Sequence, residues 1–169
     1  MTKLILFLAL FTTVGCYGQT TGYSESEIYS LFKKSISQTE KDKIEIPSNP
    51  WLICNQDSSF YYKDTIKICS NSYYRNSLNC CQYIAWTFYD KDKFISTNLE
   101  LCKEPTTASV TKDKDYFKIL VVPADNYLII STFNNDKLKD SFKLLSVDKI
   151  KQSNSDLIST VLTMVRQKQ

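Results

Sequence analysis

The chain has 169 residues, a formal net charge of +3, three glycines and no histidine. All three glycines lie within the first 22 residues, so the rest of the chain contains neither residue type. Glycine-rich phosphate loops and sites built on imidazole are therefore excluded from it. The near-neutral charge also argues against nucleic acid as a partner, because a clustered basic face would be expected. The length fits one domain with a proper core.

The first 18 residues predict an export signal. Lys3 supplies the basic start, residues 4–11 form an apolar run, and small residues follow. A run of eight residues is too short to cross a bilayer, which takes about 20. Removing the signal lowers the net charge to +2, because Lys3 is its single charged residue. We expect an exported protein that is secreted, periplasmic or anchored at the outer membrane.

Two processing routes remain open after this signal. Cleavage after Gly18 would leave Gln19 first, which resembles the mature start of many exported Bacteroidetes proteins. Alternatively, Val14-Gly15-Cys16 resembles a bacterial lipobox, whose cysteine is acylated and anchors the protein. Soluble secretion is favoured, because Thr13 stands where a lipobox usually carries leucine. In a third interpretation, Cys16 is a plain signal-peptide residue of a eukaryotic secreted protein.

A helix should follow the signal. Ser24 and Glu27 have the spacing of a capping box, and apolar residues recur behind them at helical intervals. This pattern predicts a helix from about Glu25 to Gln38. We assign residues 19–48 to this helix and a charged connector, and residues 49–169 to a β-rich domain.

The β-rich domain should contain mostly strands. They are predicted, in chain order, at 51–54, 65–69, 83–89, 94–101, 116–122, 127–133 and 142–147. Near the end of the chain, apolar residues at helical spacing predict a closing helix. They are Leu157, Ile158, Val161, Leu162 and Val165. Several of them are β-branched, which lowers the helix propensity of this segment. The expected fold class is α+β and β-rich: an antiparallel meander sheet or partly closed barrel with an N-terminal and a C-terminal helix.

Five cysteines lie outside the signal, which in an oxidising compartment leaves at least one thiol without a partner in the chain. Strands 83–89 and 94–101 are joined by a short polar loop and predict a hairpin. Pairing Tyr89 with Phe94 keeps apolar residues opposite one another and brings Cys81 opposite Cys102. We therefore predict a Cys81–Cys102 disulfide, worth about 2–4 kcal/mol.

Cys54 and Cys69 are the second expected disulfide, because they flank the aromatic segment 60–62. The adjacent pair Cys80 and Cys81 also invites a redox or metal interpretation. However, it lacks the two-residue spacer of a thioredoxin-type motif, and no histidine can complete a mixed zinc site. We expect structural cysteines and neither a metal nor another cofactor. Which cysteine stays free is left open.

Catalysis without histidine could use paired carboxylates. The candidates are Asp57, Asp64, Glu100 and Glu104. Each stands beside a lysine or in a turn, which is typical of a solvated surface. Ser30 and Lys33 match the Ser-x-x-Lys pattern of penicillin-recognising enzymes, but that family also needs a Lys-Thr-Gly strand, which this domain lacks. We expect no enzyme here.

Aromatic clusters are the most suggestive remaining feature. Aromatics inside strands are expected to pack in the core, whereas those in loops could form a contact surface for a partner. The candidate contact residues are Tyr61, Tyr62, Tyr73, Tyr74 and Arg75.

Asn49-Pro50-Trp51 is a faint echo, without glycine, of the lipocalin Gly-x-Trp signature near the first strand. Together with the expected order of signal, helix, strands and closing helix, it gives the chain a coarse resemblance to lipocalin-like proteins. That resemblance implies a barrel that holds a small apolar ligand, and it transfers no functional residue.

Three functions follow from these patterns. The first is a non-catalytic, exported cell-envelope or extracellular binding module, and the second is a lipocalin-like carrier of a small hydrophobic ligand. The third, less favoured, is a carboxylate-based hydrolase. The partner would be a protein, a glycan or a small apolar ligand, with membrane contact through Cys16 alone. A deep apolar cavity of at least about 300 Å³ would favour the carrier.

Overall fold

The computed structural model describes residues 22–36, 49–70, 80–104, 107–108, 111–151 and 158–168. The expected export signal with Cys16 lies outside the described residues, as do Tyr73, Tyr74 and Arg75.

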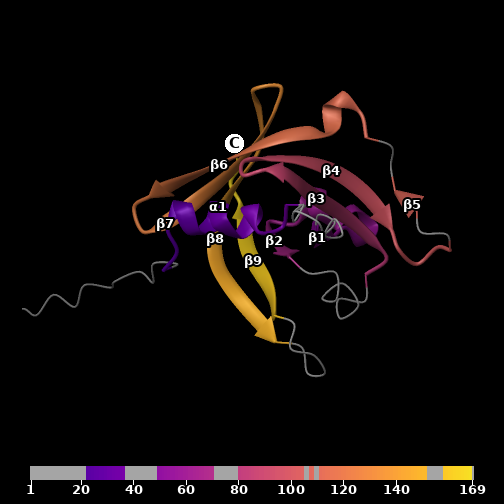
Figure 1. The fold of residues 1–169 in the computed structure, drawn as a ribbon, viewed down its shortest axis with the longest axis horizontal. Helices are drawn as coiled ribbons and strands as arrows, with labels where there is room; N and C mark the ends of the chain where they lie inside the picture. The colour runs from indigo at the N-terminus through magenta and orange to yellow at the C-terminus, as the bar shows by residue number, and fades with distance from the viewer. Residues whose placement is uncertain are drawn as a thin grey trace, which may run out of the picture.

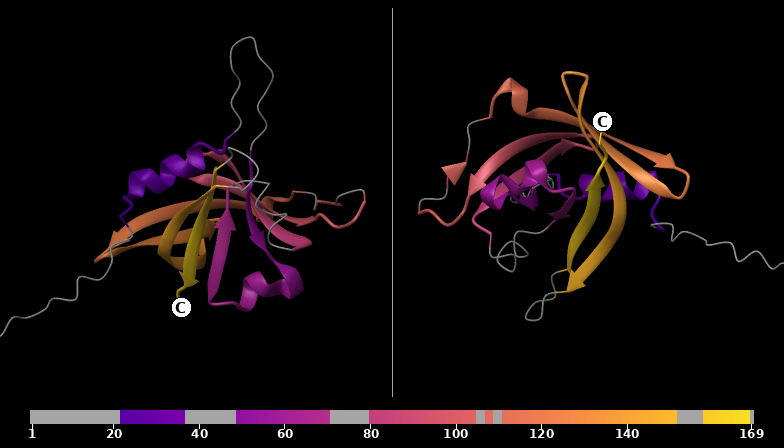
Figure 2. Two further views of the ribbon diagram at one scale, coloured as in Figure 1. Left: turned by 90° about the horizontal axis from the view of Figure 1, so that it is seen from below. Right: turned by 180° about the vertical axis from the view of Figure 1, so that it is seen from behind.

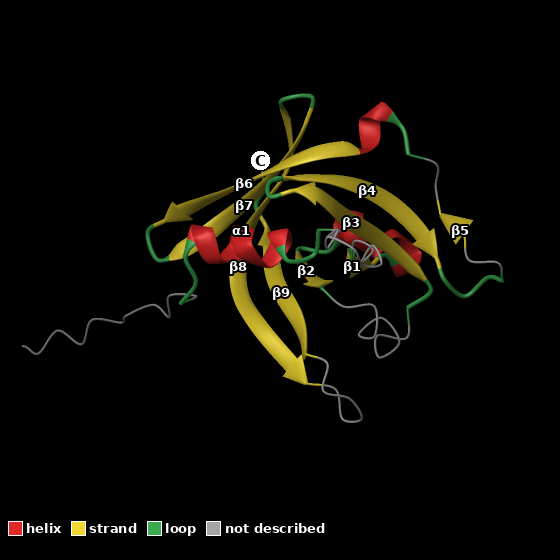
Figure 3. Cartoon of the chain, viewed as in Figure 1, coloured by secondary structure: helices red, strands yellow, loops and turns green. Residues whose placement is uncertain are grey.

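Eight antiparallel strands close into a barrel (Figures 1 and 3). They are β1 (Trp51–Cys54), β2 (Thr65–Cys69), β3 (Gln82–Asp90), β4 (Lys93–Glu100), β6 (Tyr116–Ala124), β7 (Tyr127–Asn134), β8 (Lys137–Lys151) and β9 (Ile158–Arg166). Their order around the barrel is β3-β1-β2-β9-β8-β7-β6-β4, and a β3–β4 pairing closes the ring. The short β5 (Thr107–Ala108) pairs with the end of β4. The β-rich, barrel-like class expected from the sequence is confirmed.

The strand order differs from a simple meander. β1 pairs with both β2 and β3, and β2 pairs with β9. An up-and-down barrel such as a lipocalin joins its strands in sequence order. The shared feature is therefore an eight-stranded antiparallel barrel, with the first two strands exchanged in position.

The expected closing helix is wrong, because the carboxyl-terminal segment is strand β9. The strand lies between β2 and β8 and completes the ring. Leu162 and Met164 are fully buried on its inner face, at the two-residue spacing of a strand. Ile158, placed in the helical stripe by the sequence, is 57% exposed. The β-branched residues that weakened the helix prediction suit a strand with two neighbours.

The amino-terminal helix α1 (Glu25–Lys33) begins as expected and ends earlier than Gln38. The Ser24 hydroxyl accepts a hydrogen bond from the Glu27 backbone N–H, and the Glu27 carboxylate accepts one from the Ser24 N–H, which confirms the capping box. The helix packs on β3 and β6 at one end of the barrel, as two views in Figure 2 show. Its buried residues, Ile28 and Phe32, enter the core.

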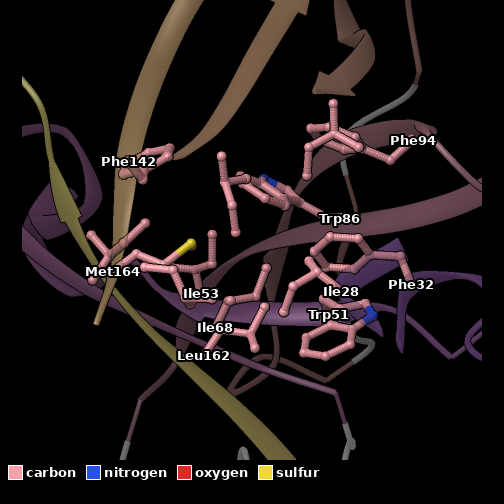
Figure 4. Packing of buried hydrophobic residues seen from close by; sticks show 14 of the residues in the cluster. Ile28, Phe32, Trp51, Ile53, Ile68, Trp86, Phe94, Phe142, Leu162 and Met164 are labelled. Atoms are coloured by element: carbon pink, nitrogen blue, oxygen red, sulfur yellow. The ribbon is translucent and has the colours of Figure 1, made fainter. Parts of the chain in front are cut away.

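The core fills the barrel end next to α1. Figure 4 shows Ile28 and Phe32 beside Trp51, with Ile68, Leu162 and other strand residues continuing the packing. The Phe32 ring stacks on Phe88 with centroids 4.4 Å apart. The indole N–H of Trp51 donates to the buried Ser35 hydroxyl over 3.1 Å, so its polar group is satisfied. This end of the barrel is therefore plugged.

The predicted register of the β3–β4 hairpin is wrong by one residue. Trp86 lies opposite Ser96, and Ile84 lies opposite Asn98, because the register shifts between Phe88 and Asp90. The observed pairing places a polar residue of β4 opposite an apolar residue of β3, contrary to the expected matching of apolar residues. The structure tolerates it because Ser96 borders a cavity and so is not forced into apolar packing.

Two disulfides join the same ends of three strands. Cys81 bonds Cys102, as expected, and Cys54 bonds Cys80. The expected Cys54–Cys69 bridge is wrong. In the β1–β2 pair Cys69 lies opposite Leu52, whereas Cys54 ends β1 beside the start of β3, close to Cys80. Cys69 is the free cysteine of the described residues.

Candidate binding cavity

The two ends of the barrel differ in what covers them. α1 and the β6–β7 turn lie at the plugged end. The opposite end carries the β1–β2 connection, with its short turns η1 (Gln56–Ser58) and α2 (Ser59–Tyr62), and the β7–β8 turn. A further short turn, η2 (Asp113–Asp115), leads into β6 at this second end. The second end is therefore the one at which a ligand could reach the interior of the barrel.

A cavity of about 390 Å³ opens into this second end of the barrel. Its lining comes from six elements and the turn η2: Phe60, Tyr61, Ile84, Trp86, Phe94, Ser96, Lys114, Phe117, Thr132, Asn134, Lys139 and Asp140. A volume of this size is within the range of small-molecule pockets, about 300–1,000 Å³. Shallower depressions on the outer surface, beside β5 and along α1, are lined mainly by polar residues.

Aromatic rings form the inner wall of the cavity. The Trp86 and Phe94 centroids are 4.6 Å apart, and Phe94 stacks on Phe117 at 5.4 Å. Trp86 and Phe94 belong to the buried core, as Figure 4 shows, so strand packing fixes their rings. Trp86 and Phe94 keep only 2% and 1% of their surface exposed and Phe117 is half-buried, so the rings form a rigid apolar wall that loses little entropy on contact with a ligand.

The lining also carries polar groups. Ser96 and Thr132 bring hydroxyls that can donate or accept hydrogen bonds. The Asn134 amide N–H₂ donates to the carbonyl oxygens of Lys114 and Tyr116 over 3.0 and 2.8 Å, which ties the end of β7 to the start of β6. Lys114 and Lys139 bring ammonium groups. The cavity therefore combines an apolar wall with polar groups, and its ammonium groups lie at the second end of the barrel, on η2 and near the start of β8.

Local side-chain bonds hold α2 over the mouth. The Asn55 side-chain oxygen accepts a hydrogen bond from the Phe60 N–H at 3.1 Å, and the Ser59 hydroxyl donates to the Cys54 carbonyl at 3.3 Å. Asp57 and Ser58 adopt left-handed backbone angles, with φ of 55° and 61°. Aspartate tolerates this conformation better than most residues other than glycine.

Arg166, at the end of β9, fastens α2 to the barrel. Its guanidinium donates to the Phe60 carbonyl oxygen over 2.6 Å and forms an ion pair with Asp140. The same group lies 5.0 Å from the Phe60 ring centroid and 4.9 Å from that of Phe142. Partial burial lowers the pKa of this guanidinium from its usual value. The group stays protonated, and so the Asp140 charge is balanced inside the structure.

Both disulfides lie at this same end of the strands, and the Cys54–Cys80 bridge packs with Leu52 and Tyr83 in a cluster apart from the cavity lining. Cys54 ends β1, Cys80 and Cys81 precede β3, and Cys102 follows β4. The vicinal pair thus joins β1 on one side and β4 on the other to the start of β3. Disulfides also indicate an oxidising environment, which is not that of the cytoplasm.

The residues selected from the sequence lie in different environments in the structure. Tyr61 and Tyr62 are 63% and 64% exposed, and Tyr61 also lines the cavity. Cys69 is buried, and burial raises the pKa of its thiol to about 12. Asp57, Asp64 and Glu104 are exposed, whereas Glu100 is paired with Lys103 at 2.9 Å. Ser30 and Lys33 lie on the exposed side of α1.

Several cavity residues were missed from the sequence, above all Thr132, Lys114 and Lys139, as was Arg166, which does not line the cavity but holds α2 beside it. Ser96 carries no clear signal, because it shares its face of β4 with Phe94, Asn98 and Glu100, of which only Phe94 is apolar. The lysines carry no such signal, because charged residues are common throughout the chain.

Comparisons with protein-family models, curated proteins and solved structures give no match for this chain. Within the described part of the chain, no helix has the length and apolar character needed to cross a membrane. The same residues contain no group of three or more cysteine, aspartate or glutamate side chains placed to hold a metal ion. The candidate function therefore depends on the cavity itself.

Proposed function

We propose that this exported protein binds a small ligand with an apolar body inside its barrel, as a carrier or receptor would. The observation that supports this function is the cavity of about 390 Å³ with a wall of stacked aromatic rings. Its volume exceeds the roughly 300 Å³ expected of a ligand site. Export is itself part of the proposal, supported by the two disulfides and the signal-like start.

Three features make the site suitable for reversible binding. The far end is plugged by α1 and Trp51, so a ligand enters from one side. The rings are fixed by core packing, which lowers the entropy lost on binding. Arg166 holds α2 beside the mouth, and the disulfides tie the ends of β1, β3 and β4 to one another at the same end of the barrel.

A fluorescent apolar probe, N-phenylnaphthylamine, tests this function directly. Its emission should rise on mixing with the protein and saturate at one probe per chain. Ser96→Trp places an indole into the cavity and should abolish this signal. Thr97→Trp is the matched control, because the neighbouring residue on the strand points to the opposite face and should leave binding unchanged.

Circular dichroism of both variants must match the wild type for the comparison to hold. The proposal is overturned if the wild type shows no saturable signal, or if Ser96→Trp binds the probe as well as the wild type does. The first outcome would favour the second candidate, a protein-interaction module. The exposed rings of Tyr61 and Tyr62 at the mouth support that candidate.

A further inference from the structure

The charged groups at the cavity mouth indicate the chemical class of the ligand. Three charged side chains line the cavity among the described residues: Lys114, Lys139 and Asp140. Asp140 is ion-paired with Arg166, so its charge is already balanced. The described residues provide no ion-pair partner for either lysine ammonium. The lining therefore carries two uncompensated positive charges.

These two lysines come from separate elements and meet at one opening. Lys114 belongs to η2, and its backbone carbonyl oxygen accepts a hydrogen bond from the Asn134 side chain. Lys139 lies near the start of β8. Asp113 and Asp115 flank Lys114, but they do not line the cavity, and the Asp115 carboxylate accepts a hydrogen bond from the Lys112 N–H at 2.7 Å. The local charge that faces the cavity is thus positive.

The depth of the cavity offers no comparable charge. Trp86 and Phe94 border the cavity there, and burying an unpaired charge against these rings would be costly. A ligand that satisfies both regions has an apolar body in the depth and its charge at the mouth.

We propose that the ligand is an anionic amphiphile: an aromatic or aliphatic body ending in one negatively charged group, such as a carboxylate or sulfonate, held between Lys114 and Lys139. This inference rests on the proposed function, because it names the class of ligand for the same cavity. The body provides affinity through apolar contact, and the two ammonium groups select the anion over a neutral analogue.

A matched pair of probes tests the selection. Anilinonaphthalene sulfonate carries the anion, and N-phenylnaphthylamine is its neutral counterpart. The double variant K114Q/K139Q should weaken binding of the sulfonate by about fivefold, the size expected when two partly exposed charge pairs are lost. Binding of the neutral probe should change by less than about twofold.

The control variant is K67Q/K149Q, which removes the same net charge from exposed lysines that do not line the cavity. It should leave both affinities within about twofold of the wild type, because distant exposed charges are screened by salt. Raising the salt concentration from about 20 to about 300 mM should weaken sulfonate binding to the wild type and barely affect K114Q/K139Q.

The outcomes separate the two proposals. If K114Q/K139Q leaves sulfonate binding unchanged, or weakens both probes equally, the anionic class is wrong while binding in the cavity stands. If K67Q/K149Q weakens the sulfonate as much, overall charge is the cause and the class is also wrong. If neither probe binds the wild type, the proposed function itself fails.

Discussion

The Arg166 contacts allow one prediction to be worked through in detail. In Arg166→Met the side chain keeps an apolar stem of similar reach but loses the guanidinium. The variant removes the hydrogen bond to the Phe60 carbonyl, the ion pair with Asp140 and the contacts with two aromatic rings. We expect the free energy of unfolding to fall by about 2–4 kcal/mol.

The magnitude follows from the individual contacts. A hydrogen bond from a charged donor contributes about 1.5–3 kcal/mol, and each cation–π contact contributes about 0.5–1 kcal/mol at a partly exposed site. The Arg166 and Asp140 side chains are 20% and 25% exposed, so water reaches the pair and reduces the ionic part. The cost of desolvating the guanidinium is recovered in the variant, which keeps the total below the sum of the contacts.

Urea denaturation followed by tryptophan fluorescence measures this loss. The comparison should include Asp140→Asn and the double variant R166M/D140N. Removing Arg166 leaves the Asp140 carboxylate partly buried and unpaired, so the double variant should be more stable than R166M by about 1 kcal/mol. A loss below about 0.5 kcal/mol in R166M, or no recovery in the double variant, would refute the assignment of Arg166 as the fastening of α2.

Two further predictions concern the cysteines. Replacing Cys54 and Cys80 by serine should lower the free energy of unfolding by about 3.5 kcal/mol, because the bridge closes a loop with a sequence separation of 26. Urea denaturation measures this change, and a loss below about 1 kcal/mol would contradict the prediction. The Cys69 thiol, whose pKa burial raises to about 12, should stay unmodified by iodoacetamide at about pH 8 and react once urea unfolds the chain, as peptide mass spectrometry would show. The protonated thiol is thus the favoured form of Cys69 in the folded state up to that pKa. Rapid labelling of the native protein would contradict the prediction, because it would show that Cys69 is accessible.

Several parts of the fold could be predicted because their signals are local. The capping box of Ser24 and Glu27 is a contact between residues three apart, so the start of α1 was correct. The first two strands, β1 and β2, were placed at their observed bounds from short apolar runs between turn residues. The Cys81–Cys102 bridge formed despite the wrong register, because Cys102 lies beyond the last residue of β4 and is not fixed by the ladder.

Other parts failed because the deciding partner is distant in the chain. The stripe in residues 158–165 has the spacing of a helix, yet pairing with β2 and β8 makes it a strand. The shift near Phe88 reversed the expected faces of β4, while Trp86 and Phe88 of β3 face the core as expected; no local pattern shows where a strand departs from regular pairing. The partner of Cys54 depended on β1 lying beside β3 as well as β2.

The sequence by itself determined a β-rich chain with a capped first helix, a surplus of one cysteine outside the signal, and the lack of glycine and histidine that removes phosphate loops and imidazole chemistry. The tertiary structure decided that the strands close into a ring, which cysteine stays free, and that Trp86, Lys114 and Lys139 share one cavity. The physical reason is one of range. Alternation and capping depend on residues a few positions apart, whereas closure of this barrel depends on β2 pairing with β9, a strand far along the chain.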